Sequence, residues 1–473
     1  MQKDFISPKI ISDAVKLADL AMIVLISAAA YMVYLEEYLN RYEDVGRYLI
    51  TSLSTALLFL IVFQWIGGYR FERFSLLNWQ LPRVVLAWFG SFSFLLMLAF
   101  TAKVSSSYSR GWAISWIIGV GVYLPISRIV LNIAIVRWAR QGHFLRNIVV
   151  VGASEVGKKF IDKLRKSPAS GARIVGVFDD RKSRILPLDK EIRFLGTTDD
   201  LLKFAREMPI DEIIIALPLN AGERLRSLFE KLKSLPVDLR LSIEPLAGMF
   251  SINGMDKIVD VPLLQITERP LKQWNGVIKK SEDLILASIL LVIFAPAMAL
   301  IAFIIKFDSP GPVFFAQDRF GFNNKAIRVL KFRTMYLDKC DPTGAKRTVR
   351  NDPRVTRFGR FLRTFSLDEL PQLINVFKGE MSLVGPRAHA IAMKAGDRLY
   401  HEAIDTYAQR HKVKPGITGW AQVNGHRGEI DTLEKARRRV NYDLEYIERW
   451  SLWFDFKILL MSVGVVFKWK SAY

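Results

Sequence analysis

Four long apolar blocks within the first 140 residues limit the possible folds more than any other feature of the chain. They cover residues 17–35, 49–66, 84–101 and 113–136. Each can cross a hydrocarbon core of about 30 Å as a helix of about 20 residues. No small-residue cleavage site follows the first block, so it does not resemble a cleaved signal peptide. One such block could be a buried soluble helix, but four in succession predict a membrane bundle over residues 1–146.

The charge of the chain lies mainly elsewhere. The 473 residues are 51% hydrophobic yet carry a formal net charge of +21, and the largest excess, +11, lies in residues 307–473. So much apolar surface excludes a disordered chain. The single cysteine, Cys340, excludes a disulfide framework or a cysteine metal cluster and fits a reducing cytosolic setting.

Lysine and arginine residues in the short loops predict the orientation of the bundle. Basic residues precede the first block, separate the second from the third and follow the fourth, whereas the loop after the first block is acidic. The loop after the third block is the least decisive. By the positive-inside rule, both ends of the bundle should face the cytosol. Arg128 lies inside the fourth block, near its cytosolic end, and we expect its side chain to snorkel to the interface.

Residues 147–272 have the pattern of a Rossmann-like α/β domain. Strands are expected at 147–153, 174–178 and 212–217, with a helix up to Lys166, and this alternation indicates a parallel sheet. The glycine fingerprint of dinucleotide sites needs a second glycine where the backbone approaches the pyrophosphate. Ser154 occupies that position. The pattern therefore favours a structural turn, with dinucleotide binding as the alternative.

A fifth apolar block, residues 284–307, contains Pro296 near its centre. Proline removes one helix hydrogen bond and clashes with the preceding turn, so a kink or break is expected there. A full crossing would also place the basic residues 308–473 outside. We therefore expect residues 273–307 to form a re-entrant membrane helix, broken at Pro296, with an ordinary kinked span as the alternative.

Residues 308–473 contain adjacent carboxylates, Asp368 and Glu369, among many arginines. Ser366 and Glu369 have the spacing of a helix capping box, and acidic residues favour helix starts. Pro371 suits the first helical turn, which weakens that interpretation. The alternative is a phosphate site in which the carboxylates and Mg²⁺ act on phosphoryl groups. The residues alone leave both open.

Two further segments of this region suggest ligand or membrane contacts. Residues 407–425 combine basic side chains, turn glycines and Trp420, which could bind a nucleotide pyrophosphate and stack on a base; a glycine-rich surface loop is the alternative. His411 alone suits a structural histidine better than a base. Residues 450–469 combine aromatic residues and lysines, which predicts an amphipathic interfacial helix, with a core-packing helix as the alternative.

Residues 279–473 resemble the bacterial sugar transferases, the polyprenyl-phosphate hexose-1-phosphate transferases. The matching stretches are SPGPVFFAQDRFG, KFRTM, DPRVTRFGRFLRTFSLDELPQLINVFKGEMSLVGPR, RHKVKPGITGWAQVNG and YDLEYIERWSLWFDFKIL. The four membrane helices and the α/β insert are similar to the large subgroup of that family. Two departures are Ala295 before Pro296, where the family often has serine, and Ala388, where it has a second proline.

The resemblance implies a function and site residues. Asp368 would be the nucleophile and would hold Mg²⁺, and Glu369 would help to activate an incoming lipid phosphate. The basic residues Lys331, Arg333, Arg363 and Arg387 would bind phosphates, and Arg319, His411, Lys414, Trp420 and Gln422 are candidates for nucleotide binding. A UDP-sugar, most simply UDP-glucose and otherwise UDP-galactose, would give its hexose-1-phosphate to undecaprenyl phosphate and release UMP.

The implied fold is a membrane α-helical bundle, a cytosolic Rossmann-like α/β domain and a mostly α C-terminal catalytic domain with a re-entrant membrane helix. The implied partners are the two substrates, the lipid bilayer and a second copy in a homodimer, with no nucleic acid. The location would be the bacterial inner membrane, with the active site on the cytosolic face and a role in starting exopolysaccharide, capsule or O-antigen synthesis. A membrane-tethered NAD(P)-dependent oxidoreductase is the competing class, and it rests on the α/β domain alone.

Overall fold

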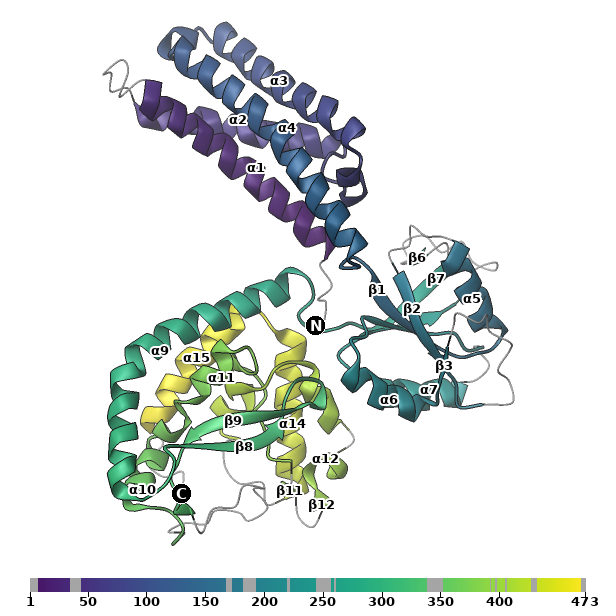
Figure 1. Ribbon diagram of the computed structural model, residues 1–473, viewed down its shortest axis with the longest axis vertical. Coiled ribbons are helices and arrows are strands. Elements are labelled where there is room, and N and C mark those ends of the chain that lie inside the picture. The colour runs from purple at the N-terminus through teal and green to yellow at the C-terminus, as the bar shows by residue number, and fades with distance from the viewer. Residues whose placement is uncertain are drawn as a thin grey trace. The chain divides into compact units, whose positions relative to one another are not determined.

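The computed structural model describes residues 7–34, 44–166, 172–181, 193–218, 222–243, 257–258, 261–337, 352–391, 393–395, 398–404, 406–426 and 432–468. The chain forms two compact units, Met1–Leu145 and Arg146–Tyr473. The first is helical, and the second combines an α/β domain with a mostly helical domain (Figure 1).

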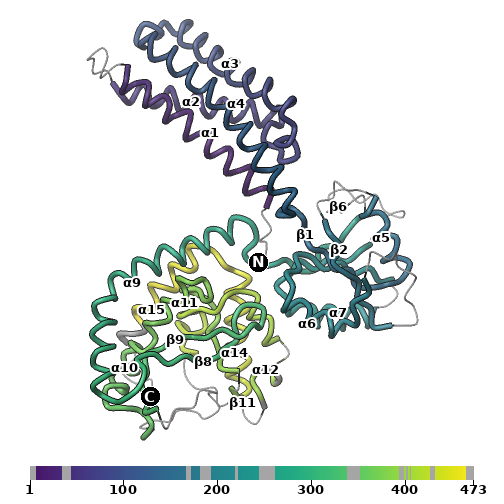
Figure 2. The backbone as a smooth tube through the Cα atoms, viewed as in Figure 1, coloured from purple at the N-terminus to yellow at the C-terminus, as the bar shows by residue number. Residues whose placement is uncertain are grey.

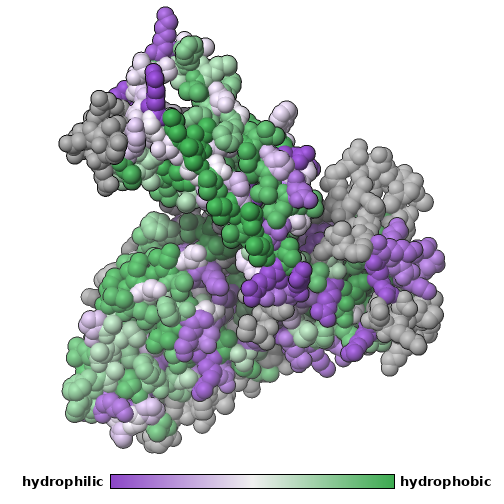
Figure 3. Space-filling model, turned by 45° about the horizontal axis from the view of Figure 1, so that its top comes forward, coloured by the Kyte–Doolittle hydropathy of each residue, from purple (hydrophilic) through white to green (hydrophobic). Residues whose placement is uncertain are grey.

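Four helices build the first unit: α1 (Pro8–Tyr31), α2 (Val45–Trp65), α3 (Leu77–Thr101) and α4 (Arg110–Arg140). All four are long and apolar enough to cross a membrane. Their shared core contains Trp88, Trp112 and Trp116, whereas many aliphatic side chains are exposed on the outside. Hydrophobic residues accordingly cover much of the visible face of the bundle (Figure 3). The four predicted helices are confirmed.

An ion pair between α1 and α4 lies inside the bundle. Arg128 Nη2 donates to Asp19 Oδ2, and the Tyr69 hydroxyl donates to the same oxygen over 2.7 Å. Asp19 and Arg128 are only 1% and 2% exposed. The expectation that Arg128 snorkels is therefore wrong. Its partner lies on another helix, 109 residues earlier, so local sequence could not reveal the pair.

We expect Asp19→Asn or Arg128→Gln to destabilise the bundle by about 2–3 kcal/mol, because each leaves a buried charge without its counterion. Reversing both charges, Asp19→Arg with Arg128→Asp, should recover part of the loss. Thermal unfolding in detergent measures the effect. Asp13→Asn, on the same helix but in the partly exposed pair with Lys16, is the control. Single variants that unfold like this control would contradict the prediction.

The α/β domain contains a seven-stranded sheet of order β3-β2-β1-β4-β5-β7-β6. Its strands are β1 (Arg146–Val151), β2 (Ala172–Phe178), β3 (Phe194–Gly196), β4 (Glu212–Ile215), β5 (Asp238–Ser242), β6 (Lys257–Ile258) and β7 (Val261–Thr267). Helices α5 (Glu155–Lys166), α6 (Thr198–Glu207) and α7 (Gly222–Leu232) accompany them. The three predicted strands, β1, β2 and β4, are parallel, as expected, and so are β3 and β5. The strands β7 and β6 were not predicted, and they pair antiparallel at one edge of the sheet.

The turn after β1 has the contacts of a structural turn. A Cβ on Gly157 would lie 2.0 Å from Gly152 O, so this glycine permits close packing of α5 on the turn. Asp179 directly follows β2, at the position where dinucleotide folds bind a ribose. Its carboxylate accepts from Ala153 N at 2.9 Å and from Arg224 Nη2 at 2.8 Å. Its carboxylate is thus engaged by the protein itself, which favours the structural interpretation.

The remaining elements form the mostly helical domain that was predicted. They are α9 (Trp274–Asp308), β8 (Phe314–Phe320), β9 (Ala326–Phe332), α10 (Arg357–Thr364), α11 (Gln372–Phe377), β10 (Ser382–Val384), β11 (Lys394–Ala395), β12 (Arg398–Leu399), α12 (Tyr400–Ala403), β13 (Gly416–Thr418), α13 (Trp420–Val423), α14 (Leu433–Arg449) and α15 (Leu452–Lys468). β8 and β9 make an antiparallel hairpin, and β10 pairs in parallel with β13.

Helix α9 is one continuous α-helix with Pro296 inside it, which corrects the predicted break to a bend. The bend is plain in the backbone trace (Figure 2). Before the proline, Ala287 packs in a cluster with Leu373 and Ile458; after it, Ile301 packs with Phe332. The bend therefore lets both halves of α9 pack against the same domain.

Candidate active site

A tight turn between α10 and α11 presents Asp368 and Glu369. Ser366 has φ +56° and ψ 22°, which places it in the left-handed region, and Leu367–Glu369 then form one 3₁₀ turn. Pro371 is the N-cap of α11, and Ser366 makes no side-chain cap. The capping-box interpretation is therefore wrong, because the turn aims both carboxylates inward instead of starting a helix with them.

Two cations from separate elements hold this carboxylate pair. Lys331 on β9 places Nζ 2.8 Å from Glu369 Oε1 and 3.7 Å from Asp368 Oδ2. Arg387, after β10, donates from Nη2 to Glu369 Oε1 over 2.6 Å and from Nη1 to Oε2 over 3.3 Å. Asp368 and Glu369 are 8% and 9% exposed. Residues far apart in sequence thus meet in one charged site.

The surroundings separate the acidities of the two carboxyl groups. Burial raises the pKa of Asp368, and the Lys331 charge only partly offsets this, while Glu369 raises it further. Burial also opposes ionisation of Glu369, but Arg387 and Lys331 outweigh it and hold the pKa of Glu369 well below its usual range. Glu369 is thus a fixed anion, whereas Asp368 is a less stabilised carboxylate available for chemistry.

Removing Lys331 should change the pH dependence of the reaction. The resemblance implies that ionised Asp368 is the nucleophile, so we expect activity to fall as pH drops through its raised pKa. Lys331→Met removes the largest influence that lowers this pKa, and the acid limb should move to higher pH while the rate falls on the order of 10²-fold. The measurement is UMP release against pH. Lys325→Met, at the exposed tip of the same hairpin, is the control, and an unmoved limb would contradict the assignment.

The two other predicted phosphate ligands differ in placement. Arg363 donates from Nε to Thr334 Oγ1 at 2.9 Å, and its charge acts on Asp368. Arg333 is 4% exposed and donates instead to the carbonyls of Ser309 and Pro310, just after α9. Its predicted phosphate role is thus corrected to holding the end of this helix. A Cβ on Gly311 would lie 2.0 Å from Arg333 Nη1, which explains the glycine.

Among the predicted nucleotide ligands, Arg319 lies beside the site. Its Nη1 donates to Ala388 O at 2.8 Å, and burial followed by the charge of Arg387 lowers its pKa to about 10. His411 bonds through Nδ1 to Asn324 Oδ1 and packs on Phe320. These contacts stabilise the tip of the β8–β9 hairpin, so His411 has a structural role.

The other three candidates lie on the α9, α14 and α15 side of the domain. The Trp420 indole donates to Glu445 Oε2 at 3.0 Å and packs edge-on against Phe454, and base stacking by this half-buried ring stays a prediction. Lys414 interacts electrostatically with Asp283 of α9. Gln422 is 7% exposed and donates to Ile417 O at 3.3 Å, and its Oε1 has no partner among the described residues.

Sequence reasoning missed a buried cluster behind Arg387. Arg410 Nη2 donates to Arg387 O at 2.8 Å and pairs with Asp443 Oδ2 at 2.6 Å. Asp443 also interacts with Arg439, whose pKa burial lowers to about 10. The cluster joins α14 to the backbone of Arg387, the residue that pairs with Glu369. The sequence signal that could have revealed this cluster is the spacing of Arg439 and Asp443. They lie four residues apart, about one helical turn, at positions that α14 buries.

The carboxylate pair also fits Mg²⁺. The described part of the chain has no group of three or more His, Cys, Asp or Glu side chains that could hold a metal. Mg²⁺ usually takes only one or two carboxylates and completes its octahedral shell with water and substrate phosphates. Asp368, with Glu369 next to it, meets that requirement.

Comparisons with known proteins agree with this site. A family model described as bacterial sugar transferase matches residues 274–469, and one described as CoA-binding domain matches residues 64–242. The first match contains the whole carboxylate site. The second begins within α2 of the helical unit and ends in β5 of the α/β domain.

Relatives extend the similarity to most of the chain. The UDP-glucose:undecaprenyl-phosphate glucose-1-phosphate transferase of Escherichia coli (strain K12) is 37% identical over 444 residues, which cover 90% of this chain and 91% of that protein. The undecaprenyl-phosphate glucose phosphotransferase of Komagataeibacter xylinus is 41% identical over 321 residues, 67% of this chain and 58% of that protein. An Aeromonas hydrophila N-acetylgalactosaminephosphotransferase is 39% identical over 190 residues, 40% of this chain and 43% of that protein. The chain belongs to the bacterial sugar transferase family.

Proposed function

We propose that the protein transfers glucose-1-phosphate from UDP-glucose to undecaprenyl phosphate, forming undecaprenyl-diphospho-glucose and UMP. The observation that carries the proposal is the buried Asp368–Glu369 pair, fixed by Lys331 and Arg387 with Arg319 and Arg363 beside it. A reactive carboxylate surrounded by cations suits attack on a phosphoryl group. The printed functions of the Escherichia coli and Komagataeibacter relatives support the choice of substrates.

The reaction proceeds in two displacements at one phosphorus atom. An Asp368 carboxylate oxygen attacks the phosphorus that bears glucose, the pyrophosphate P–O bond breaks and UMP leaves with the bonding electrons. An oxygen of undecaprenyl phosphate then attacks the same phosphorus and displaces the carboxylate, which restores Asp368. Arg387, Lys331 and Arg363 orient the phosphates and offset their charge. When bound at Asp368, Mg²⁺ supplies further neutralisation of phosphoryl charge.

Glu369 has an orienting role in this scheme. The sequence resemblance implied that it helps to activate the lipid phosphate. Its depressed pKa makes it a weak proton acceptor, and a phosphate monoester with a second pKa near 6 is already largely dianionic at neutral pH. Glu369 thus acts by holding Lys331 and Arg387 in place.

The contacts of α9 support re-entry from the cytosolic face. As a straight helix, its 35 residues would reach about 52 Å, well beyond a hydrocarbon core of about 30 Å. Both halves pack instead on the catalytic domain, while Val292 and Ile293 near the bend are 76% and 61% exposed. We propose that these apolar side chains at the bend enter the lipid and that both ends of the helix lie on the side of the active site.

Apolar surface on α10 and α15 fits the same membrane contact. Phe361 on α10 and Phe365, its C-cap residue, are 50% and 51% exposed, and Trp453 on α15 is 80% exposed. The opposite face of α15 packs inward through Phe454 and Ile458. The helix therefore combines the two roles foreseen as alternatives, a core-packing face and an interfacial face.

The test is UMP release by the purified full-length protein with Mg²⁺, UDP-glucose and undecaprenyl phosphate. We expect UMP and undecaprenyl-diphospho-glucose in equal amounts. UMP release with UDP-galactose in place of UDP-glucose would transfer the proposal to galactose. No release with either sugar or with their N-acetylated analogues would overturn it.

A further inference from the structure

The backbone that connects β10 to Arg387 is closely held. Gly385 N donates to Thr418 O at 2.9 Å, and Gly416 N donates to Pro386 O at 3.0 Å. A Cβ on Gly385 would lie 2.6 Å from Lys414 O, so no larger residue fits there without a shift. A displacement of β10 would therefore reach Arg387, only three residues beyond the strand.

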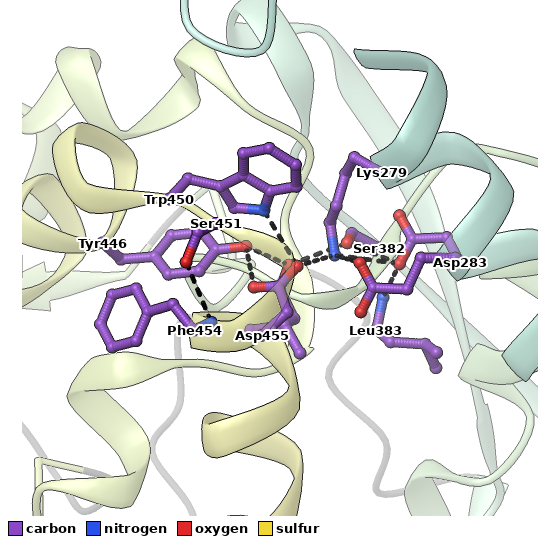
Figure 4. A network of polar contacts seen from close by, with 11 residues as sticks. Lys279, Asp283, Ser382, Leu383, Tyr446, Trp450, Ser451, Phe454 and Asp455 are labelled. Carbon is purple, nitrogen blue, oxygen red and sulfur yellow. Dashed lines mark hydrogen bonds and ion pairs between the residues drawn. The ribbon is translucent and has the colours of Figure 1, made fainter. Parts of the chain in front are cut away.

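Helix α9 fixes β10 through one carboxylate. Asp283 Oδ1 accepts from the backbone N of Leu383 and from the Ser382 hydroxyl, each at 2.9 Å (Figure 4). Asp283 is 6% exposed, so water competes little for these bonds. The side chain that holds the strand thus belongs to the apolar helix and not to the strand's own sheet.

The carboxylate is itself fixed by an ion network. Lys279, one turn earlier on α9, lies 3.2 Å from Asp283 Oδ1 and 2.6 Å from Asp455 Oδ2 of α15. Asp455 is fully buried and accepts from the Trp450 indole at 3.0 Å, and the Tyr446 hydroxyl lies 2.9 Å from its Oδ1 (Figure 4). The network joins both apolar helices to β10.

Such a network has a high desolvation cost, and apolar packing of similar volume is commonly at least as stable. Its geometry provides what apolar packing cannot, a directional pair of hydrogen bonds to β10. We infer that Asp283 is a positioning residue that holds β10, and through it Arg387, in the position where Arg387 pairs with Glu369. This inference rests on the proposed function of the site.

Substitutions at Asp283 separate hydrogen bonding from charge. Asp283→Leu removes the hydrogen-bond acceptor and leaves Lys279 paired with Asp455. We expect kcat for UMP release to fall 10- to 100-fold, while KM for UDP-glucose changes less than threefold. Asp283→Asn retains an oxygen acceptor and should recover most of this loss. Ser288→Ala, a change on the same helix whose hydroxyl donates to Leu284 O within α9, should retain wild-type kcat.

A double-mutant cycle tests whether the effect passes through Arg387. In an Arg387→Lys background, Asp283→Leu should lower kcat less than twofold further. Ser382→Ala removes one donor to Asp283 and should lower kcat about threefold in the wild-type background, with little further loss in the Arg387→Lys background. This variant carries the test if Asp283→Leu does not fold. Unchanged kcat in Asp283→Leu, or equal losses in both backgrounds, would overturn the inference. Absence of UMP release by the wild-type protein would instead overturn the proposed function.

Discussion

Asp368→Asn should lower the rate of UMP release by at least about 10⁴-fold, because an amide cannot form the covalent phosphoryl bond. The measurement is UMP release at saturating UDP-glucose and undecaprenyl phosphate. Burial raises the pKa of Asp368, which means that the folded protein disfavours the ionised carboxylate. The charge of Asp368 therefore does not stabilise the fold. The variant should therefore retain its unfolding temperature while losing activity.

Asp318→Asn is the matched control, since it makes the same change at an exposed position of β8. It should keep wild-type activity. An Asp368→Asn protein that still releases UMP at a tenth of the wild-type rate or faster would remove Asp368 from the role of nucleophile.

Asp443→Asn should destabilise the protein by about 3–5 kcal/mol, because it leaves the buried cations Arg410 and Arg439 without the carboxylate between them. Arg410 is 1% exposed and Arg439 is 3% exposed, so solvent cannot replace the lost charge. The shift of the midpoint of denaturant unfolding measures the effect. UMP release should also fall, since Arg410 holds the backbone of Arg387.

The control for this prediction lies on the same helix. Glu434 of α14 pairs with Arg438 at 2.6 Å, with both side chains exposed. Glu434→Gln should cost less than about 0.5 kcal/mol. If Asp443→Asn unfolds at the same midpoint as Glu434→Gln, the buried cluster does not have the structural importance assigned to it.

Local patterns were sufficient to predict much of the fold. The four long apolar helices follow from block length and apolar content, because the thickness of a bilayer fixes the length of a helix able to cross it. Three strands of the α/β domain follow from short apolar runs between turn residues. The carboxylate pair and its arginines were found because they lie in contiguous motifs that resemble a family.

Contacts between distant segments could not be predicted in this way. Arg128 lies in an apolar block, and nothing near it indicates Asp19 on another helix. Arg333 belongs to a basic motif, yet it holds the carbonyls after α9 because the β8–β9 hairpin passes there. The antiparallel direction of β7 and the pairing of Arg410 with Asp443 likewise depend on how distant segments come together in the fold. Hydrophobic periodicity does not specify this.

Incubation with UDP-glucose alone, without undecaprenyl phosphate, distinguishes covalent catalysis by Asp368 from direct transfer to the lipid. Covalent catalysis predicts release of about one UMP per active site, together with a hexose-phosphate adduct that mass spectrometry locates on the peptide containing Asp368. Addition of undecaprenyl phosphate should then remove the adduct and start steady turnover. UMP release that begins only when the lipid acceptor is added, with no adduct on the protein, would contradict the covalent step.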